Sequence, residues 1–360
     1  MSSAGAGYSE VDQRIPHDDP RLACFAPLPG VGSAGALRLE RFPPAVHAQF
    51  AGNLGPLANV RSSAGCALLL RTDSPSLVVE LERLRHHQPV PSALALEVEH
   101  ADGWQGVHGC DLREADGDLS VGFATGLERG GGTRLVALWL PLISTCALRA
   151  IALCRGARLE QAAAPAPRWL AIGDSLTQGF SVQSPLQSWV HRLSRRWNLP
   201  AWNLGVGGIH IAPQAFAWAL RAQRFDLVTI ALGSNHLWQD EACARAGELA
   251  AELAGLALAG SAAGEAHGRI AWLLPPWKPC EDGKGPRDFA GVPLDQAVAR
   301  RAGLVRAALV ERLAACAPRI ELVADLMPHD HRLLPDGLHP CAHGAARFAD
   351  NLDQALHGKR

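Results

Sequence analysis

The spacing of apolar residues changes on either side of the Ala/Pro-rich stretch 161–167. Before it, short apolar runs alternate with polar residues at a period of two, which is typical of antiparallel strands. After it, short apolar runs alternate with longer stretches of helical spacing, which indicates strand–helix–strand units and a parallel sheet. The sequence therefore predicts two domains of different class. We expect a flexible terminus at 1–20, a β-sandwich at 21–160, a linker at 161–167 and a second domain at 168–360.

The first half contains many short runs with strand character, separated by Gly- or Asp-rich turns. They are 67–71, 77–82, 93–99, 119–123, 133–140 and 147–153. The stretch 72–76 predicts a strand–turn–strand unit from the first two runs. Many short strands at this spacing favour an all-β sandwich of jelly-roll type.

The second half alternates strands with helices. The predicted strands are 169–172, 201–204, 227–232, 270–274 and 320–323, and the clearest helices are 241–258 and 294–315. Along the latter helix, one apolar face is expected to hold Val298, Leu304, Val305, Leu309 and Leu313. Five strands with helical crossovers predict a doubly wound parallel sheet, whose site lies at the carboxyl ends of the strands.

Composition narrows the class of partner. The charges of the 34 basic and 35 acidic side chains nearly cancel, which argues against a nucleic-acid partner. The sequence contains no apolar run of 18 residues, so it predicts no membrane span. The polar N-terminus has no signal-peptide pattern. The nine cysteines are scattered without a C-x-x-C pair, as expected of reduced thiols. We therefore expect a cytoplasmic protein without a nucleic-acid or membrane partner; the sequence leaves its oligomeric state open.

Polar motifs follow the predicted strands at four places where a site must lie. Ser175 stands in Gly-Asp-Ser-Leu, Gly208 ends a glycine run, and Asn235 follows the third strand. Near the end of the chain, Asp336 precedes His339 by three residues, so that its carboxylate can take the Nδ1 proton and leave Nε2 as a base. A serine, an oriented histidine and two donors for an oxyanion are what acyl transfer requires.

These four blocks resemble the SGNH hydrolases of the GDSL esterase/lipase superfamily, over roughly residues 168–356. The resemblance implies a flavodoxin-like three-layer α/β/α domain and no cofactor. It also implies that Ser175 is the nucleophile, that His339 is the base and that Asp336 orients it. The oxyanion hole would comprise the N–H groups of Ser175 and Gly208 and the side-chain amide of Asn235.

Two neighbouring positions bear on this assignment. Gly208 is chosen within its glycine run because the family's glycine stands five residues after an Asn, and Asn203 fits that spacing. His236 stands where the family often has Asp, which bears on the structure of the loop more than on the chemistry.

The first half is similar to a bacterial subfamily in which a β-sandwich with a G-x-D-L-Y motif precedes the SGNH domain. The similar segments are 109–112 and 138–142, and Arg113 stands where that pattern has Tyr. Two-domain carbohydrate acetylesterases share this domain order. The resemblance therefore implies an acylated sugar as the substrate class.

Each motif also has a plain structural interpretation. Ser175 could be only a helix N-cap, Gly208 a tight turn, Asn235 a capping amide of its loop, and Asp336 a cap of the turn before His339.

Outside these motifs, Trp238 and Trp277 could contact substrate or only pack in the core. The His329-Asp330-His331 segment offers too few ligands for a metal, so we expect a solvated loop and no metal; His86 and His87 have the same interpretation.

The hypothesis that follows is a cofactor-independent serine esterase. It removes a short acyl group, such as acetyl, from a carbohydrate or a similar small hydroxylated molecule. One alternative is a lipase or thioesterase for longer acyl chains. Another is a non-catalytic glycan-binding protein on an SGNH scaffold.

Overall fold

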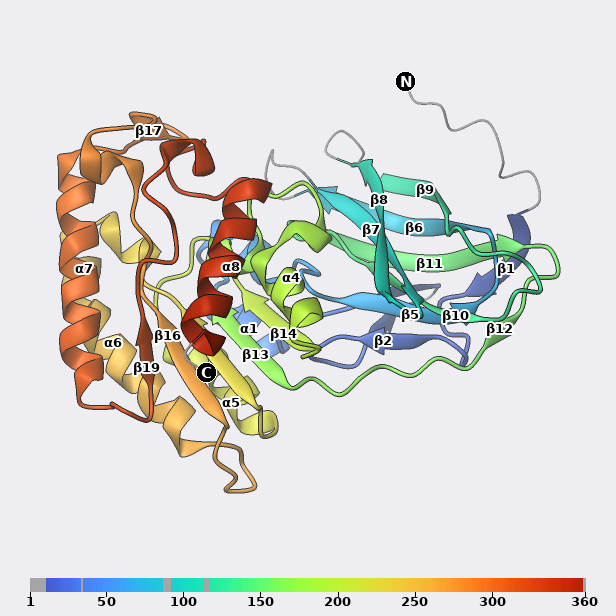
Figure 1. Cartoon of the computed structure of the whole chain (residues 1–360), viewed down its shortest axis with the longest axis horizontal. Coiled ribbons are helices and arrows are strands. Elements are labelled where there is room, and N and C mark those ends of the chain that lie inside the picture. The colour runs from blue at the N-terminus through green and yellow to red at the C-terminus, as the bar shows by residue number, and fades with distance from the viewer. Residues whose placement is uncertain (1–10, 34, 87–91, 113–116, 359–360) are drawn as a thin grey trace. The chain divides into compact units, whose positions relative to one another are not determined.

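The computed structural model describes residues 11–33, 35–86, 92–112 and 117–358 (Figure 1). Residues 1–10 of the expected flexible terminus, His87 and Arg113 lie outside the described residues. The chain forms two compact units. The first holds Met1–Ala48, Leu57–Ala166 and Gln183–Leu186, and the second holds Gln49–Pro56, Pro167–Val182 and Gln187–Arg360. The domain boundaries given above stay predictions.

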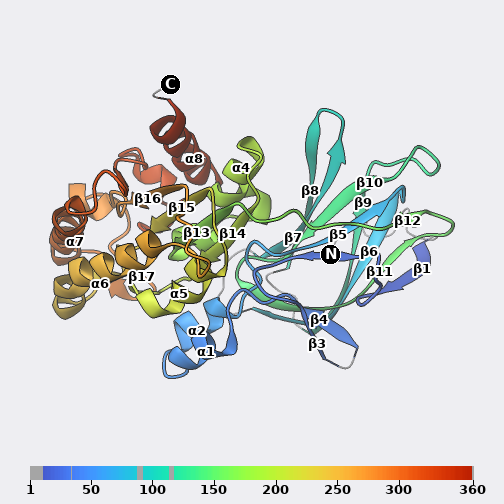
Figure 2. The same ribbon diagram turned by 90° about the horizontal axis from the view of Figure 1, so that it is seen from below.

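The first unit consists of two antiparallel six-stranded sheets that share one apolar core (Figure 2). The first sheet runs β3 (Val31–Ser33), β4 (Ala36–Arg38), β11 (Ser144–Cys154), β6 (Ser76–His86) and β9 (Gly117–Ala124), with β1 (Val11–Pro16) on β11. The second runs β12 (Leu159–Glu160), β5 (Ala67–Thr72), β10 (Arg134–Trp139), β7 (Ala93–His100) and β8 (Gly103–Asp111), with β2 (Ala23–Phe25) on β5. All six predicted strands of the first half are present.

The predicted strand–turn–strand order around 72–76 is confirmed, but β5 and β6 belong to different sheets, so the two strands do not pair with each other. Side chains of the connection bond to distant backbone instead. Thr72 Oγ1 donates to the carbonyl of Arg158 at 2.6 Å, and the Asp73 carboxylate accepts from the N–H of Arg158 at 2.7 Å. The segment therefore crosses between the sheets. Two short helices, α1 (Pro44–Gln49) and α2 (Leu54–Val60), were not predicted.

The second unit is the predicted doubly wound domain. Its five parallel strands lie in the order β14 (Ala201–Gly205), β13 (Trp169–Gly173), β15 (Leu227–Ala231), β16 (Arg269–Leu273) and β19 (Glu321–Val323). Helices α4 (Trp189–Arg196) and α8 (Ala342–His357) cover one face of the sheet. Helices α5 (Pro213–Ala222) and α6 (Asp240–Ala259) cover the other, and α7 (Gln296–Ala314) packs against α6 (Figures 1 and 2). This is the flavodoxin-like three-layer arrangement.

Alternating side chains of the sheet enter different helix layers. Trp169 and Ala171 of β13 share a core cluster with Trp189 of α4 and Phe348 of α8. Such burial on both faces explains why the strands are almost entirely apolar. Leu304 does not belong to the buried face of α7, as it is 48% exposed, whereas Val298, Val305, Leu309 and Leu313 are buried. Within the described residues, no helix combines the length and apolarity that crossing a bilayer requires.

Candidate active site

The four predicted blocks lie at the carboxyl edge of the parallel sheet. Ser175 begins α3 (Ser175–Gln178) directly after β13, Gly208 follows β14, and Asn235 lies in the 3₁₀ helix η2 (Ser234–Leu237) after β15. These three strands are neighbours, and the direction of winding reverses at β13. Ligands of open α/β sheets bind at such a switch point. His339 comes from the loop before α8.

Ser175, His339 and Asp336 form a continuous hydrogen-bonded chain. His339 Nε2 lies 2.9 Å from Ser175 Oγ, and His339 Nδ1 lies 2.8 Å from Asp336 Oδ2. Because an ionised carboxylate only accepts, Nδ1 carries the proton and Nε2 accepts from the serine hydroxyl. The structure thus brings together the three residues that the sequence placed 161 and 3 positions apart.

Asp336 also shapes the loop that presents His339. Its Oδ1 accepts from the backbone N–H of Leu338 at 2.9 Å and of His339 at 2.7 Å. Burial alone would raise the pKa of Asp336, but the hydrogen bond and charge of His339 and these two N–H groups outweigh burial and lower it. Asp336 is therefore ionised at neutral pH, and its two carboxylate oxygens have different partners.

The glycine run after β14 is tied to the helix that carries Ser175. Asn203 Nδ2 donates to the carbonyl of Thr177 at 2.8 Å, and Gln178 Oε1 accepts from the N–H of Gly207 at 2.7 Å. A Cβ on Gly205 would lie 2.0 Å from the nitrogen of Gln178, so only glycine allows this approach. Asn203 therefore positions the loop.

Three N–H donors remain for an anionic oxygen. Within the described residues, the backbone N–H groups of Ser175 and Gly208 have no hydrogen-bond acceptor. Asn235 Nδ2 donates one hydrogen to the carbonyl of Ile209 at 2.9 Å, which leaves its second hydrogen available. Gly208 has φ +78°, a conformation that glycine adopts without strain.

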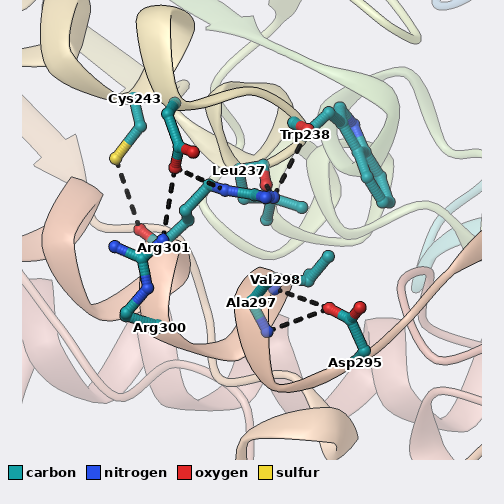
Figure 3. Close-up of polar contacts among 9 residues, drawn as sticks. Leu237, Trp238, Cys243, Asp295, Ala297, Val298, Arg300 and Arg301 are labelled. Atoms are coloured by element: carbon teal, nitrogen blue, oxygen red, sulfur yellow. Dashed lines mark hydrogen bonds and ion pairs between the residues drawn. The ribbon is translucent and has the colours of Figure 1, made fainter.

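An arginine from α7 holds the loop that carries Asn235 (Figure 3). Arg301 Nη1 donates to the carbonyls of Leu237 at 2.7 Å and Trp238 at 3.3 Å, and its Nε donates to Asp240 at 2.9 Å. Asp295 caps the start of the same helix. The loop with the carboxamide is therefore fixed by a helix some sixty residues later in the sequence.

His236 fixes the same loop from the other side. It is 1% exposed, its Nδ1 lies 2.7 Å from the carbonyl of Ala242, and its Nε2 accepts from the N–H of Ile211 at 2.8 Å. Burial lowers the pKa of His236 to about 4, against the hydrogen bond to Ala242. The imidazole is therefore neutral at pH 7, with its proton on Nδ1, and it connects two loops around Asn235.

Two buried ionisable residues, Asp174 (directly before Ser175) and Lys278, were not identified from the sequence. Asp174 caps α3 by accepting from the N–H of Leu176 at 3.0 Å, and Lys278 is 1% exposed with no hydrogen-bond partner for Nζ among the described residues. Burial raises the pKa of Asp174 and lowers that of Lys278, and each charge opposes the effect on the other. The sequence feature that could have predicted the burial of Lys278 is its position inside the apolar stretch 274–280.

Two aromatic rings that the sequence analysis did not single out lie beside His339. Phe180 lies 4.4 Å and Phe289 5.2 Å from His339, centroid to centroid. Phe289 comes from the small hairpin of β17 (Asp288–Phe289) and β18 (Val292–Pro293). Trp277 packs in the core with 7% exposure and stacks on His329 at 4.6 Å, centroid to centroid. Half-buried Trp238 packs on the cluster around Leu237, and substrate contact by either tryptophan stays a prediction.

In the segment His329-Asp330-His331, which was expected to be a solvated loop, the Asp330 side chain bonds to a residue two positions later in the chain. The Asp330 carboxylate accepts from the N–H of Arg332 at 3.0 Å and pairs with its guanidinium at 2.7 Å. In the part of the chain that the structure describes, no group of three or more His, Cys, Asp or Glu side chains is arranged to hold a metal ion.

Comparison with solved structures extends the likeness to both units. The chain is similar to the salicylyl-acyltransferase SsfX3 from a tetracycline biosynthetic pathway, with 22% identity, a TM-score of 0.73, and 96% of this chain and 97% of that one covered. A GDSL-like lipase from Bacteroides ovatus has 15% identity, the same TM-score and the same coverage. A family two carbohydrate esterase from Cellvibrio japonicus has 13% identity, a TM-score of 0.56, and 96% and 97% coverage. At these identities the likeness establishes the fold.

Family assignment rests on the second unit. No curated protein sequence that was compared matches the chain. Residues 171–347 match the profile of the GDSL-like Lipase/Acylhydrolase family, and this range includes Ser175, Gly208, Asn235, Asp336 and His339. Residues 171–347 of this chain therefore form a GDSL-like lipase/acylhydrolase domain, and an antiparallel β-rich unit precedes it in the sequence.

Proposed function

We propose that the protein is a serine esterase that acts through an acyl-enzyme intermediate. The observation that carries the proposal is the chain of contacts from Asp336 through His339 to Ser175, at 2.8 and 2.9 Å. This arrangement joins a nucleophile, a base and a group that orients the base, which is the set that covalent acyl transfer requires.

In the proposed reaction, Ser175 Oγ attacks the ester carbonyl while its proton passes to His339 Nε2. The oxyanion accepts hydrogen bonds from the N–H groups of Ser175 and Gly208 and from the side chain of Asn235. When the intermediate collapses, His339 returns the proton to the leaving alkoxide. Water then attacks the acyl-enzyme with His339 as base, which releases the acid and restores Ser175.

We further propose a short acyl group, acetyl above all, on a carbohydrate or a similar small hydroxylated molecule. Support comes from the resemblance to two-domain acetylesterases and from the names of proteins with a similar fold. These include a family two carbohydrate esterase and an acetyl xylan esterase from Butyrivibrio proteoclasticus. A cytoplasmic location is also a proposal, and the eight cysteines whose side chains the structure describes, all free, are compatible with it.

The test is hydrolysis of p-nitrophenyl esters from acetate to octanoate by the intact protein and Ser175→Ala. Ser194→Ala, on a partly exposed face of α4, is the matched control. We expect rapid acetate turnover in the control and a loss of at least about 10³-fold in kcat for Ser175→Ala. Equal turnover in the two variants would contradict the role of Ser175.

The same assay separates the alternatives. Preference for octanoate would favour a lipase or thioesterase and contradict the short acyl group. Absence of turnover with retained sugar binding would favour a glycan-binding protein and contradict the esterase. Faster nitrophenol release on adding a sugar alcohol, with formation of a new ester, would show that the acyl acceptor is an alcohol rather than water.

A further inference from the structure

The first unit contains a polar cavity of about 610 Å³, whose lining shares Leu39 with the apolar core. Its lining includes Arg38, Glu40, His47, Arg61, Glu82 and Arg85, all of which belong to that unit. Cavities of this size bind small molecules. The cavity lies wholly in the antiparallel β-rich unit, so it is distinct from the site around Ser175.

The pleat of the first sheet explains why these side chains meet. On β11, Cys146 and Leu148 enter the core, so Thr145 and Ala147 face the other way and line the cavity. Thr145 pairs in register with Arg85 of β6, and β4, which ends at Arg38, lies on the other side of β11. His47 of α1 and Arg61, which follows α2, complete the lining. The cavity is therefore built on the outer face of three adjacent strands.

The charges in the cavity do not pair with one another. Among the described residues, the guanidinium groups of Arg38, Arg61 and Arg85 make no ion pair, although Glu40 and Glu82 line the same space. Guanidinium groups only donate hydrogen bonds, and they bind carboxylates and phosphates well. Three guanidinium groups against two carboxylates favour a ligand with one negative charge.

Two buried side-chain atoms of the lining residues have no hydrogen-bond partner in the described chain. They are Glu82 Oε2 and His47 Nε2. Burial, together with the charges of the nearby arginines, lowers the pKa of His47 despite the opposing charge of Glu40, so its ring is neutral at pH 7. A carboxylate oxygen requires a donor, which a simple anion such as acetate cannot supply but a hydroxyl group can.

From this chemistry we infer that the cavity binds a small polyhydroxylated anion of the sugar-acid class. The carboxylate of the ligand lies among the three guanidinium groups, and its hydroxyl groups donate to Glu82 and bond to His47. Leu39 and Ala147 are the apolar side chains among the lining residues, and no Phe, Tyr or Trp ring is among them. The lining therefore disfavours an acyl chain or an aromatic ligand. The inference does not depend on the proposed esterase activity.

The experiment is calorimetric titration of the full chain with glucuronate, glucose and inorganic phosphate. Glucuronate should bind with one-to-one stoichiometry and at least about tenfold more tightly than glucose or phosphate. Arg61→Ala and Glu82→Gln should each weaken glucuronate binding at least about tenfold. Arg149→Ala, an exposed arginine of β11 outside the lining, should leave it unchanged.

Several results would overturn the inference. They are no glucuronate binding, equal affinity for glucose, equal affinity for phosphate, or binding that neither Arg61→Ala nor Glu82→Gln weakens. Thermal unfolding of each variant shows whether it is folded. Because the two substitutions lie on different elements, one variant still tests the inference if the other does not fold. Turnover of p-nitrophenyl acetate by the same variants should equal that of the intact protein. A failed esterase assay and a failed titration are thus separate results.

Discussion

Replacing Asp336 by Asn separates two tasks of one side chain. The amide oxygen of Asn can still accept from the N–H groups of Leu338 and His339, which Asp336 Oδ1 binds at 2.9 and 2.7 Å. Its NH₂ group, in the place of Oδ2, cannot accept the proton of His339 Nδ1. The imidazole then carries its proton on Nε2, which faces Ser175 Oγ at 2.9 Å and can no longer take the serine proton.

The loss should appear in kcat. In Ser–His–Asp proteases, the wrong tautomer of the histidine costs about 10⁴-fold in kcat. If the proposed reaction holds, we expect a fall of about 10³- to 10⁴-fold here, which is roughly 4–5.5 kcal/mol of activation free energy. Stability should change little in Asp336→Asn. Asp336→Ala also loses both backbone hydrogen bonds, so its free energy of unfolding should be lower than that of the Asn variant by about 2 kcal/mol.

The assay is kcat for p-nitrophenyl acetate, together with urea unfolding of each variant. Asp330→Asn is the matched control, because Asp330 also accepts a backbone N–H two residues later, from Arg332 at 3.0 Å, in the same region of the chain. A kcat for Asp336→Asn within tenfold of the intact protein would refute the assignment of the His339 proton to Nδ1.

Three further predictions concern the structure around the site. The pKa of His236 is about 4 in the folded protein against an ordinary 6.5, so its contribution to stability is complete above about pH 6.5 and is lost as pH falls, by about 3 kcal/mol at pH 4. In urea unfolding at several pH values, the free energy of unfolding should therefore fall less steeply below pH 6.5 for His236→Gln than for the intact protein. An unchanged dependence on pH would exclude His236 as the cause. Lys278→Met removes the cation that lowers the pKa of buried Asp174, so the pKa of Asp174 should rise further and the variant should lose more free energy of unfolding, relative to the intact protein, at pH 8 than at pH 5; an equal loss at both pH values, as measured by urea unfolding, would contradict the influence of Lys278 on Asp174. On α7, Leu309→Ala should lower the free energy of unfolding by about 2–5 kcal/mol and Leu304→Ala by less than about 0.5 kcal/mol, as measured by urea unfolding, because only Leu309 is buried; similar losses would contradict the described face of the helix.

Local periodicity was enough to predict the fold class. The five strands of the parallel sheet and the helices 241–258 and 294–315 appear within one or two residues of the predicted bounds. The cause is that a residue's place on a strand or helix follows from its neighbours, and parallel strands bring their carboxyl ends to one edge. The order of motifs along the chain was therefore sufficient to predict that Ser175, Gly208 and Asn235 share that edge.

The partners of each element were not predictable in the same way. Residues far away in the chain decide which sheet β5 or β6 joins. They also decide whether Leu304 lies on the buried or the exposed side of α7. The same is true of the ring of Phe289 beside His339, the burial of Lys278 near Asp174, and the cavity beside β11. The sequence by itself determined which backbone elements form, in what order, and which motifs carry Ser175, Asp336 and His339. Only the tertiary structure decided which side chains surround them, because burial and electrostatic environment arise from contacts between segments whose spacing in the sequence carries no local signal.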